Sequence, residues 1–166
     1  MIITANELSL IQHADPDASV EEILQDPEIL EKLSESRSFQ GPMPSNICFR
    51  IENNEGTIGQ ICIKSIRWIN RKAGISLFIK RDMQGKGYGM SSLQAIIEYG
   101  FMRLNLFRLE AEVIDGNKAS LKLMQQSGFT EEGRQRKAKF VNGVYKDLII
   151  FGLLKEEYLL SLKQDK

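Results

Sequence analysis

The spacing of apolar residues changes near the middle of the chain. Four of the five residues from Ile75 to Ile79 are apolar, which is typical of a buried strand. From Met90 to Leu104 the apolar residues recur three and four positions apart, which predicts an amphipathic helix. Gly85, Gly87 and Gly89 lie between the two patterns. The sequence therefore predicts a strand, a glycine-rich turn and a helix in direct succession.

The preceding part of the chain predicts a strand, two helices and a hairpin. A short strand is expected around Leu8–Gln12. Val20–Gln25 and Glu28–Ser36 have the spacing of two short amphipathic helices, and a proline separates them. Ile47–Glu52 and Thr57–Arg67 flank a polar turn, so we expect these two runs to pair as a hairpin.

The segment after the central helix begins with a strand and a capped helix. Charged residues alternate with apolar ones over Phe107–Ile114, which predicts a half-buried strand. The next helix is expected over Lys118–Gln126, because Asn117 is a favourable N-cap and Gly128 is a favourable residue just beyond the end.

The last third of the chain predicts a second hairpin. A strand is expected within Glu131–Lys139 and another over Val144–Leu154, joined by the strong turn signal Asn142-Gly143. The tail beyond is short and charged. The complete order predicts one α+β domain over residues 1–166, with a mixed, mostly antiparallel central sheet of about six or seven strands and helices on both faces. The strands on either side of the central helix should be parallel.

Composition narrows the class of protein. The 166 residues are 42% hydrophobic, which is enough for a real core. Lys+Arg and Asp+Glu number 22 each, so no net charge favours a nucleic acid or a membrane surface as partner. The chain shows no signal peptide and no long apolar run. Cys48 and Cys62 are interpreted as reduced core residues of a cytoplasmic protein. The sequence has no cluster of histidines or cysteines that would predict a metal site.

The glycine-rich turn indicates an anion-binding site. Glycine lets the backbone turn tightly and approach a ligand closely, and the first amides of a helix have no partner within it. A phosphate fits such a position, and Lys86 adds a cation. The spacing matches neither the P-loop nor the dinucleotide-binding fingerprint. A plain turn and a nucleotide-binding module remain as alternatives.

Several motifs resemble the GNAT family of N-acetyltransferases. The string Gln84-Gly85-Lys86-Gly87-Tyr88-Gly89 fits Q-x-x-G-x-G, the pattern of the acetyl-CoA pyrophosphate loop in that family. Other matching pieces occur in the same order and spacing as in the branch of ribosomal-protein N-terminal and spermidine/spermine acetyltransferases. They are Tyr99-Gly100-Phe101, Leu104-Asn105-Leu106, Asn117-x-x-Ser120, Ser127-Gly128-Phe129, Glu132-Gly133 and Asn142-Gly143-x-Tyr145-x-Asp147.

The resemblance implies acetyl-CoA as co-substrate and no metal. The end of the central strand would offer backbone to the pantetheine arm, the glycine loop would hold the pyrophosphate, and the following capped helix would flank the thioester. The implied contacts come from Leu77, Phe78, Ile79, Gln84, Gly85, Lys86, Gly87, Tyr88, Gly89, Met90, Asn117, Ser120 and Met124. An amide near Phe78 or Ile79 would stabilise the oxyanion.

The implied acid and base positions depart from the family pattern. Met124 stands where many members have a tyrosine, and Lys139 stands where ribosomal-type enzymes have a glutamate. Ser120 and Tyr145 are the candidate catalytic residues; Glu112 could act as a base through water. Polyamine-type enzymes tend to have a glutamate at the position of Gly74.

Two functions follow from the resemblance. The first is an acetyl-CoA-dependent N-acetyltransferase acting on a primary amine, which could be a polyamine, another small amine or a protein N-terminus. The alternative is an acyl-CoA-binding sensor or scaffold of the same fold with weak or lost catalysis. We expect no nucleic-acid or membrane partner. The apolar final strand, Val144–Leu154, could pair across a homodimer.

Overall fold

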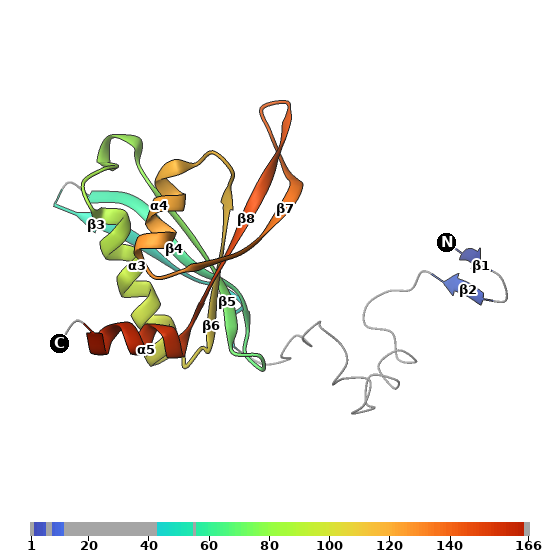
Figure 1. Ribbon diagram of the computed structural model, residues 1–166, viewed down its shortest axis with the longest axis horizontal. Helices are drawn as coiled ribbons and strands as arrows, with labels where there is room; N and C mark the ends of the chain where they lie inside the picture. Colours follow the sequence, from blue (N-terminus) through green and yellow to red (C-terminus); the bar gives the residue numbers. More distant parts are fainter. Residues whose placement is uncertain (1, 6–7, 12–42, 55, 165–166) are drawn as a thin grey trace. The chain divides into compact units, whose positions relative to one another are not determined.

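A computed structural model of this protein describes residues 2–5, 8–11, 43–54 and 56–164. Contacts divide the chain into residues 1–37 and 38–166, and each unit is described by itself. In the first unit β1 (Ile2–Ala5) pairs antiparallel with β2 (Leu8–Ile11), where the sequence predicted only the second of these strands (Figure 1). The predicted helices Val20–Gln25 and Glu28–Ser36 lie outside the described residues.

The second unit is built on a six-stranded sheet in the order β3-β4-β5-β6-β8-β7. Only β5 and β6 are parallel, and every other neighbouring pair is antiparallel. The predicted mixed, mostly antiparallel sheet is therefore confirmed. Its strands are β3 (Ile47–Asn53), β4 (Gly56–Arg67), β5 (Lys72–Ile79), β6 (Arg108–Ile114), β7 (Thr130–Val141) and β8 (Val144–Leu154).

Two predicted helices cover one face of this sheet (Figure 1). The central helix α3 (Tyr88–Glu98) continues through a π-helical turn, η2 (Tyr99–Arg103), and connects β5 to β6. Helix α4 (Lys118–Gln126) has the predicted bounds. The two helices are in contact, since the hydroxyl of Ser127, the C-cap residue of α4, lies 3.4 Å from the Met90 sulfur.

A third helix, α5 (Lys155–Gln164), replaces the charged tail expected from the sequence. Its start is capped by Glu157, whose carboxylate accepts from the Leu154 amide at 2.8 Å. Tyr158 packs against Phe101 of η2, with ring centroids 5.4 Å apart. This aromatic contact joins residues distant in sequence and packs α5 against the segment that continues α3.

The core lies between these helices and the sheet. Leu93 and Phe101 from the central helical segment meet Leu109 of β6 and Phe151 of β8, and all four are fully buried. Burial of this kind stabilises by about 1.5–3 kcal/mol for each large apolar side chain. The core therefore fixes the positions of β6, β8 and α3 relative to one another.

The final strand does not reach the edge of the sheet. β8 lies between β6 and β7 and pairs with both. Residues 148–152 of β8 are paired on both sides and could not pair across a homodimer, whereas residues 144–146 pair with β7 alone. The homodimer itself stays a prediction. The edges are β3 and β7.

The two cysteines are joined, which corrects the expectation of reduced residues. Cys48 of β3 lies opposite Cys62 of β4, and the two form a disulfide with a Cα–Cα distance of 4.1 Å. Cys62 is buried as expected, whereas Cys48 is exposed. The hairpin register brought together two residues that are 14 positions apart in the sequence.

Candidate functional site

A cleft opens where the two parallel strands separate. The pairing of β5 with β6 ends at Ile75 and Ala111, although the strands run on to Ile79 and Ile114. A cavity of about 710 Å³ lies there, with walls from β4, β5, β6, β7 and α4. The separation leaves backbone groups of β5 without a neighbouring strand, so an extended ligand can bind along it.

Backbone direction along β5 determines which groups face the cleft. The Lys80 amide donates to the Ile58 carbonyl of β4 at 2.8 Å. Successive residues of a strand point to opposite sides, so the Phe78 backbone also faces β4, while Leu77 and Ile79 face away from it. The Ile79 carbonyl accordingly accepts from the Gln84 side chain at 2.9 Å. Gln84 thus ties the glycine loop to the end of the strand.

The glycine loop leaves the start of α3 open to a ligand. Gly85 and Gly87 have φ angles of 76° and 85°, which L residues rarely adopt, and no atom lies within 4 Å of where their side chains would begin. Gly87 is the N-cap and has no side chain to satisfy the first helical amides. These donors and the helix dipole favour an anion.

The loop lies beside the cleft. A Cβ at Gly89 would be within 3.8 Å of Leu123 and 3.9 Å of Leu77, and both of these residues line the cleft. Lys86 contacts the Met83 sulfur at 3.5 Å, and Tyr88 and Met90 belong to the first turn of α3. One ligand could therefore place an anion at the loop and an extended arm along β5.

Helix α4 presents three predicted residues to the same cleft. The Ser120 amide donates to the Asn117 carboxamide oxygen at 3.1 Å, so Asn117 is the predicted N-cap. At the other end Gly128, with φ 85°, and the bond from the Phe129 amide to the Met124 carbonyl terminate the helix. Asn117, Ser120 and Met124 all line the cleft.

A cluster that sequence reasoning missed holds the turn before α4. Arg134 donates to Asp115 at 2.7 Å and to Asp147 at 3.2 Å, and Asp147 also accepts from the Lys137 amide at 2.9 Å. The Lys137 amide, followed by Arg134, lowers the pKa of the Asp147 carboxyl below its usual value. Asp147 stands in one of the matched family motifs, but its partners come from β7 and from the turn.

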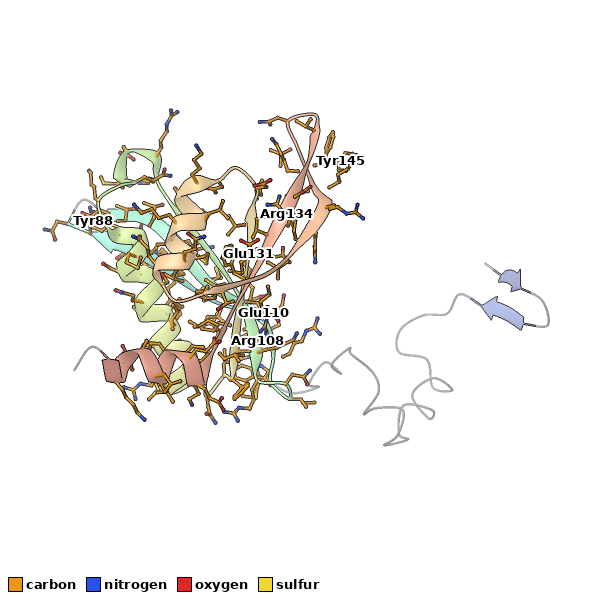
Figure 2. The ribbon with its side chains drawn as sticks, in the orientation of Figure 1. Tyr88, Arg108, Glu110, Glu131, Arg134 and Tyr145 are labelled. Atoms are coloured by element: carbon orange, nitrogen blue, oxygen red, sulfur yellow. A yellow bond between two sulfur atoms is a disulfide. The ribbon has the colours of Figure 1, made fainter. Side chains whose placement is uncertain are left out.

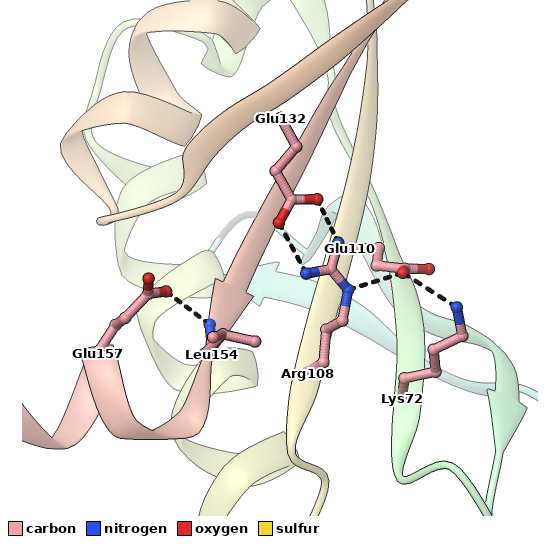
Figure 3. Close-up of polar contacts among 6 residues, drawn as sticks. All are labelled: Lys72, Arg108, Glu110, Glu132, Leu154 and Glu157. Atoms are coloured by element: carbon pink, nitrogen blue, oxygen red, sulfur yellow. Dashed lines mark hydrogen bonds and ion pairs between the residues drawn. The ribbon is translucent and has the colours of Figure 1, made fainter.

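A chain of ion pairs crosses the sheet next to the cleft (Figure 3). Glu110 accepts from Lys72 at 3.3 Å and from Arg108 at 2.8 Å, and Arg108 also forms an ion pair with Glu132 of β7. Burial raises the pKa of Glu110, but Arg108 and Lys72 outweigh it, so the net shift is downward. Glu110 is therefore ionised and already paired.

The candidate tyrosine lies apart from the other predicted residues. Tyr145 is 63% exposed near the turn of the β7–β8 hairpin (Figure 2), and its ring contacts that of Phe140 in a tilted arrangement with centroids 4.9 Å apart. It is not part of the cleft lining, whereas Glu112 and Lys139 are. Sequence reasoning also missed Lys64, Arg67 and Glu110 in the lining. Among these three residues, only Glu110 had a signal in the sequence, which was the alternation of charged and apolar residues in β6.

The described residues contain no group of three or more histidine, cysteine, aspartate or glutamate side chains that could hold a metal ion. Within the same residues, no helix has the length and apolar character needed to cross a membrane.

The open parallel pair and the glycine-rich helix start beside it are the arrangement that the sequence resemblance to GNAT acetyltransferases led us to expect. Residues 7–150 match the family model of the acetyltransferase (GNAT) domain, and the chain belongs to this family. The resemblance found in the sequence is thus confirmed.

Similar proteins include two from bacteria. The chain is 35% identical over 100 residues to a protein of Bacillus subtilis (strain 168) named "Putative ribosomal N-acetyltransferase YdaF"; the match covers 60% of this chain and 55% of that protein. It is 31% identical over 102 residues to a spermidine N(1)-acetyltransferase of Vibrio cholerae, covering 61% and 59%. The chain thus spans under two thirds of the length of these relatives.

The fold is also similar to a solved structure. The spermidine/spermine N-acetyltransferase SpeG from Vibrio cholerae superposes with a TM-score of 0.68 at 28% identity, covering 71% of this chain and 72% of that one. This similarity confirms the predicted fold class.

Proposed function

We propose that this protein is an acetyl-CoA-dependent N-acetyltransferase that moves an acetyl group to a primary amine. The observation that carries the proposal is that the glycine loop lies directly beside the cleft between β5 and β6. Gly89 of the loop lies next to Leu77 and Leu123 of the cleft. Membership of the acetyltransferase family supports it. The residues fit acetyl-CoA, because a phosphate site and a strand edge for an amide-containing arm are adjacent.

Each part of the site has a role in this proposal. Amides of the first turn of α3, with Lys86, hold the pyrophosphate. The backbone of Leu77 and Ile79 binds the pantetheine arm, and one of these two amides stabilises the oxyanion. Asn117 keeps its side-chain NH₂ for pantetheine, since only its oxygen is used by the cap. Acetyl-CoA supplies the thioester that the amine attacks.

We assign the proton donor for the departing thiolate to Ser120. Of the two candidates, only Ser120 lines the cleft, while Tyr145 lies at the hairpin. Met124 is 5% exposed and has no proton to donate, so it packs against the site. The expected cytoplasmic location stays a prediction, and its argument from reduced cysteines no longer holds.

Acetyl-CoA binding tests the loop. Gly87→Asp should weaken the affinity by at least about tenfold, because it adds a carboxylate at the anion site. Gly143→Asp is the matched control, since Gly143 also has a positive φ and open surroundings but lies in the β7–β8 turn. Calorimetric titration of the folded proteins, with ATP and NAD as competing ligands, measures the difference. Equal affinities for both variants would remove the loop from the proposed site.

The alternative function, an acyl-CoA-binding sensor or scaffold, predicts a different assay outcome. Buried Met124 and the lysine at 139 are the features that favour it. It predicts acetyl-CoA binding at unchanged stoichiometry, with no thiol release for any amine in a broad panel. Thiol release dependent on one class of amine would exclude it.

A further inference from the structure

The cleft has a charged part to which the proposed cofactor contacts assign no role. Leu77, Asn117, Ser120, Leu123 and Met124 form the part next to the glycine loop. The remaining charged lining consists of Lys64, Arg67, Lys72, Glu110, Glu112 and Lys139. Lys64, Arg67 and Lys72 come from the ends of β4 and β5 remote from the glycine loop, which follows the other end of β5. They are therefore available to the acceptor rather than to the pyrophosphate.

The charges of this lining do not balance. It has four cations and two carboxylates. Glu110 is paired with Lys72 at 3.3 Å and with Arg108 at 2.8 Å. The exposed side chains of Lys64, Arg67 and Lys139 have no ion pair among the residues that the structure describes, and only Glu112 remains to oppose them.

The floor between these charges has no carboxylate of its own. Gly74 lies between Lys64 and Glu110 in the register of β4, β5 and β6. A Cβ there would meet the Lys64 carbonyl at an ordinary contact distance of 3.7 Å, so a side chain would fit at this position. A polycation would find no unpaired carboxylate here except Glu112, and it would be repelled by the lysines and the arginine.

The same cations would help the acceptor to react. Nearby positive charge lowers the pKa of an amine, because it disfavours the ammonium form. An amine held among Lys64, Arg67 and Lys139 would thus be uncharged more often and could release its proton to water.

We propose, on the basis of the acetyltransferase function above, that the acceptor is a primary amine carrying an anionic group, a carboxylate or a phosphate. Lys64, Arg67 and Lys139 hold the anion. The amine nitrogen forms a bond to the acetyl carbon, the carbon–sulfur bond breaks, the amine proton passes to water and the thiolate of CoA is protonated. The products are the amide and free CoA.

Competing acceptors test the charge preference. Three amidated tripeptides, Ser-Asp-Asp, Ser-Asn-Asn and Ser-Lys-Lys, share an N-terminal residue and differ in charge. Phosphoethanolamine against ethanolamine tests a small phosphate-bearing source, and spermidine represents polyamines. Thiol release at saturating acetyl-CoA gives kcat/KM for each. We expect an anionic acceptor to exceed its neutral partner by about tenfold, with less preference at 0.5 M salt.

Variants locate the effect. Lys64→Gln combined with Arg67→Gln should reduce the preference for the anionic acceptor over its neutral partner to about threefold or less. Lys163→Gln, on the exposed surface of α5, is the control and should keep the full preference. Whether the acidic tripeptide or phosphoethanolamine has the higher kcat/KM shows whether the acceptor is a carboxylate-bearing peptide or a small phosphate-bearing amine.

Two outcomes would overturn the proposal in different ways. If kcat/KM for Ser-Lys-Lys or spermidine equalled or exceeded that for the anionic acceptors, the cations would not select the acceptor. The acetyltransferase function would still stand. If acetyl-CoA bound but none of the acceptors caused thiol release, the acetyltransferase function would be overturned, and this inference with it.

Discussion

At the residue scale, the chemistry of the cleft depends on two positions one helical turn apart. Ser120 and Met124 share a face of α4 and both line the cleft. Only the serine has an exchangeable proton. Its amide is used by the cap, but this leaves its hydroxyl free to act, because the bond to Asn117 is made by the backbone.

Ser120→Ala should therefore slow turnover without unfolding the helix. The alanine keeps the capped amide, so we expect an unchanged acetyl-CoA affinity and a kcat lower by about tenfold or more, as for loss of a general acid. Ser161→Ala, on α5, controls for loss of a hydroxyl elsewhere. Thiol-release assays give kcat, and calorimetric titration gives the acetyl-CoA affinity. A kcat equal to that of the control would reduce Ser120 to a first-turn residue.

At the element scale, the start of α4 combines a structural and a proposed binding role. Asn117 caps the helix through its oxygen, and the Arg134 cluster holds the preceding Asp115. The turn is also tied by the bond from the Asp115 amide to the Asp147 carbonyl, at 3.0 Å. The orientation of α4 toward the cleft thus depends on β7 and β8 as well as on its own sequence.

Two substitutions separate the roles of Asn117. Asn117→Ala should lower the free energy of unfolding by about 1 kcal/mol through loss of the cap. Asn117→Asp keeps an oxygen for the Ser120 amide, so its stability should stay within a few tenths of a kcal/mol, but it loses the NH₂ donor and adds charge. Urea unfolding and calorimetry compare them. If Asn117→Asp bound acetyl-CoA as tightly as the native protein, Asn117 would be a cap alone.

At the scale of the whole molecule, one parallel pair in an antiparallel sheet creates the site. The crossover through α3 makes β5 and β6 parallel, and their divergence opens the cleft. The ion pairs of Lys72, Glu110, Arg108 and Glu132 join β5, β6 and β7 at the closed end. The hydrogen bond from Arg108 is the main cause that lowers the pKa of Glu132.

Acid should weaken this connection. The pKa values of Glu110 and Glu132 are lowered in the folded state, so their contribution is complete above the unfolded value of about 4.3 and is lost as pH falls through the lower folded values. Arg108→Gln should reduce the free energy of unfolding at pH 7, and the difference from the native protein should narrow by pH 3. Urea unfolding at both pH values measures it.

Arg50→Gln is the control for this comparison. It removes an ion pair with Glu52 whose side chains are 75% and 53% exposed, compared with 23% for Arg108. Exposed pairs contribute little, so its unfolding free energy should stay near that of the native protein. A difference for Arg108→Gln that is the same at pH 7 and pH 3 would mean that the network does not couple stability to pH.

The sequence by itself determined the six strands, α3 and α4 of the second unit and the proposed cofactor loop, but not α5. Hydrophobic period, the Asn117 cap and the Asn142-Gly143 turn are local signals, and α4 and β8 have the predicted bounds. Both turn residues have positive φ, as that turn type requires. Such features depend on neighbours a few residues apart, so a pattern along the chain records them.

The tertiary structure alone decided which distant residues meet. It put β8 inside the sheet, joined Cys48 to Cys62 and held the tail as α5 against Phe101. It also gathered unpaired cations from β4 and β7 around one cleft and left Tyr145 outside it. These outcomes depend on strand order, register and the point where β5 and β6 diverge. Contacts between remote segments set all three, and no local pattern encodes them.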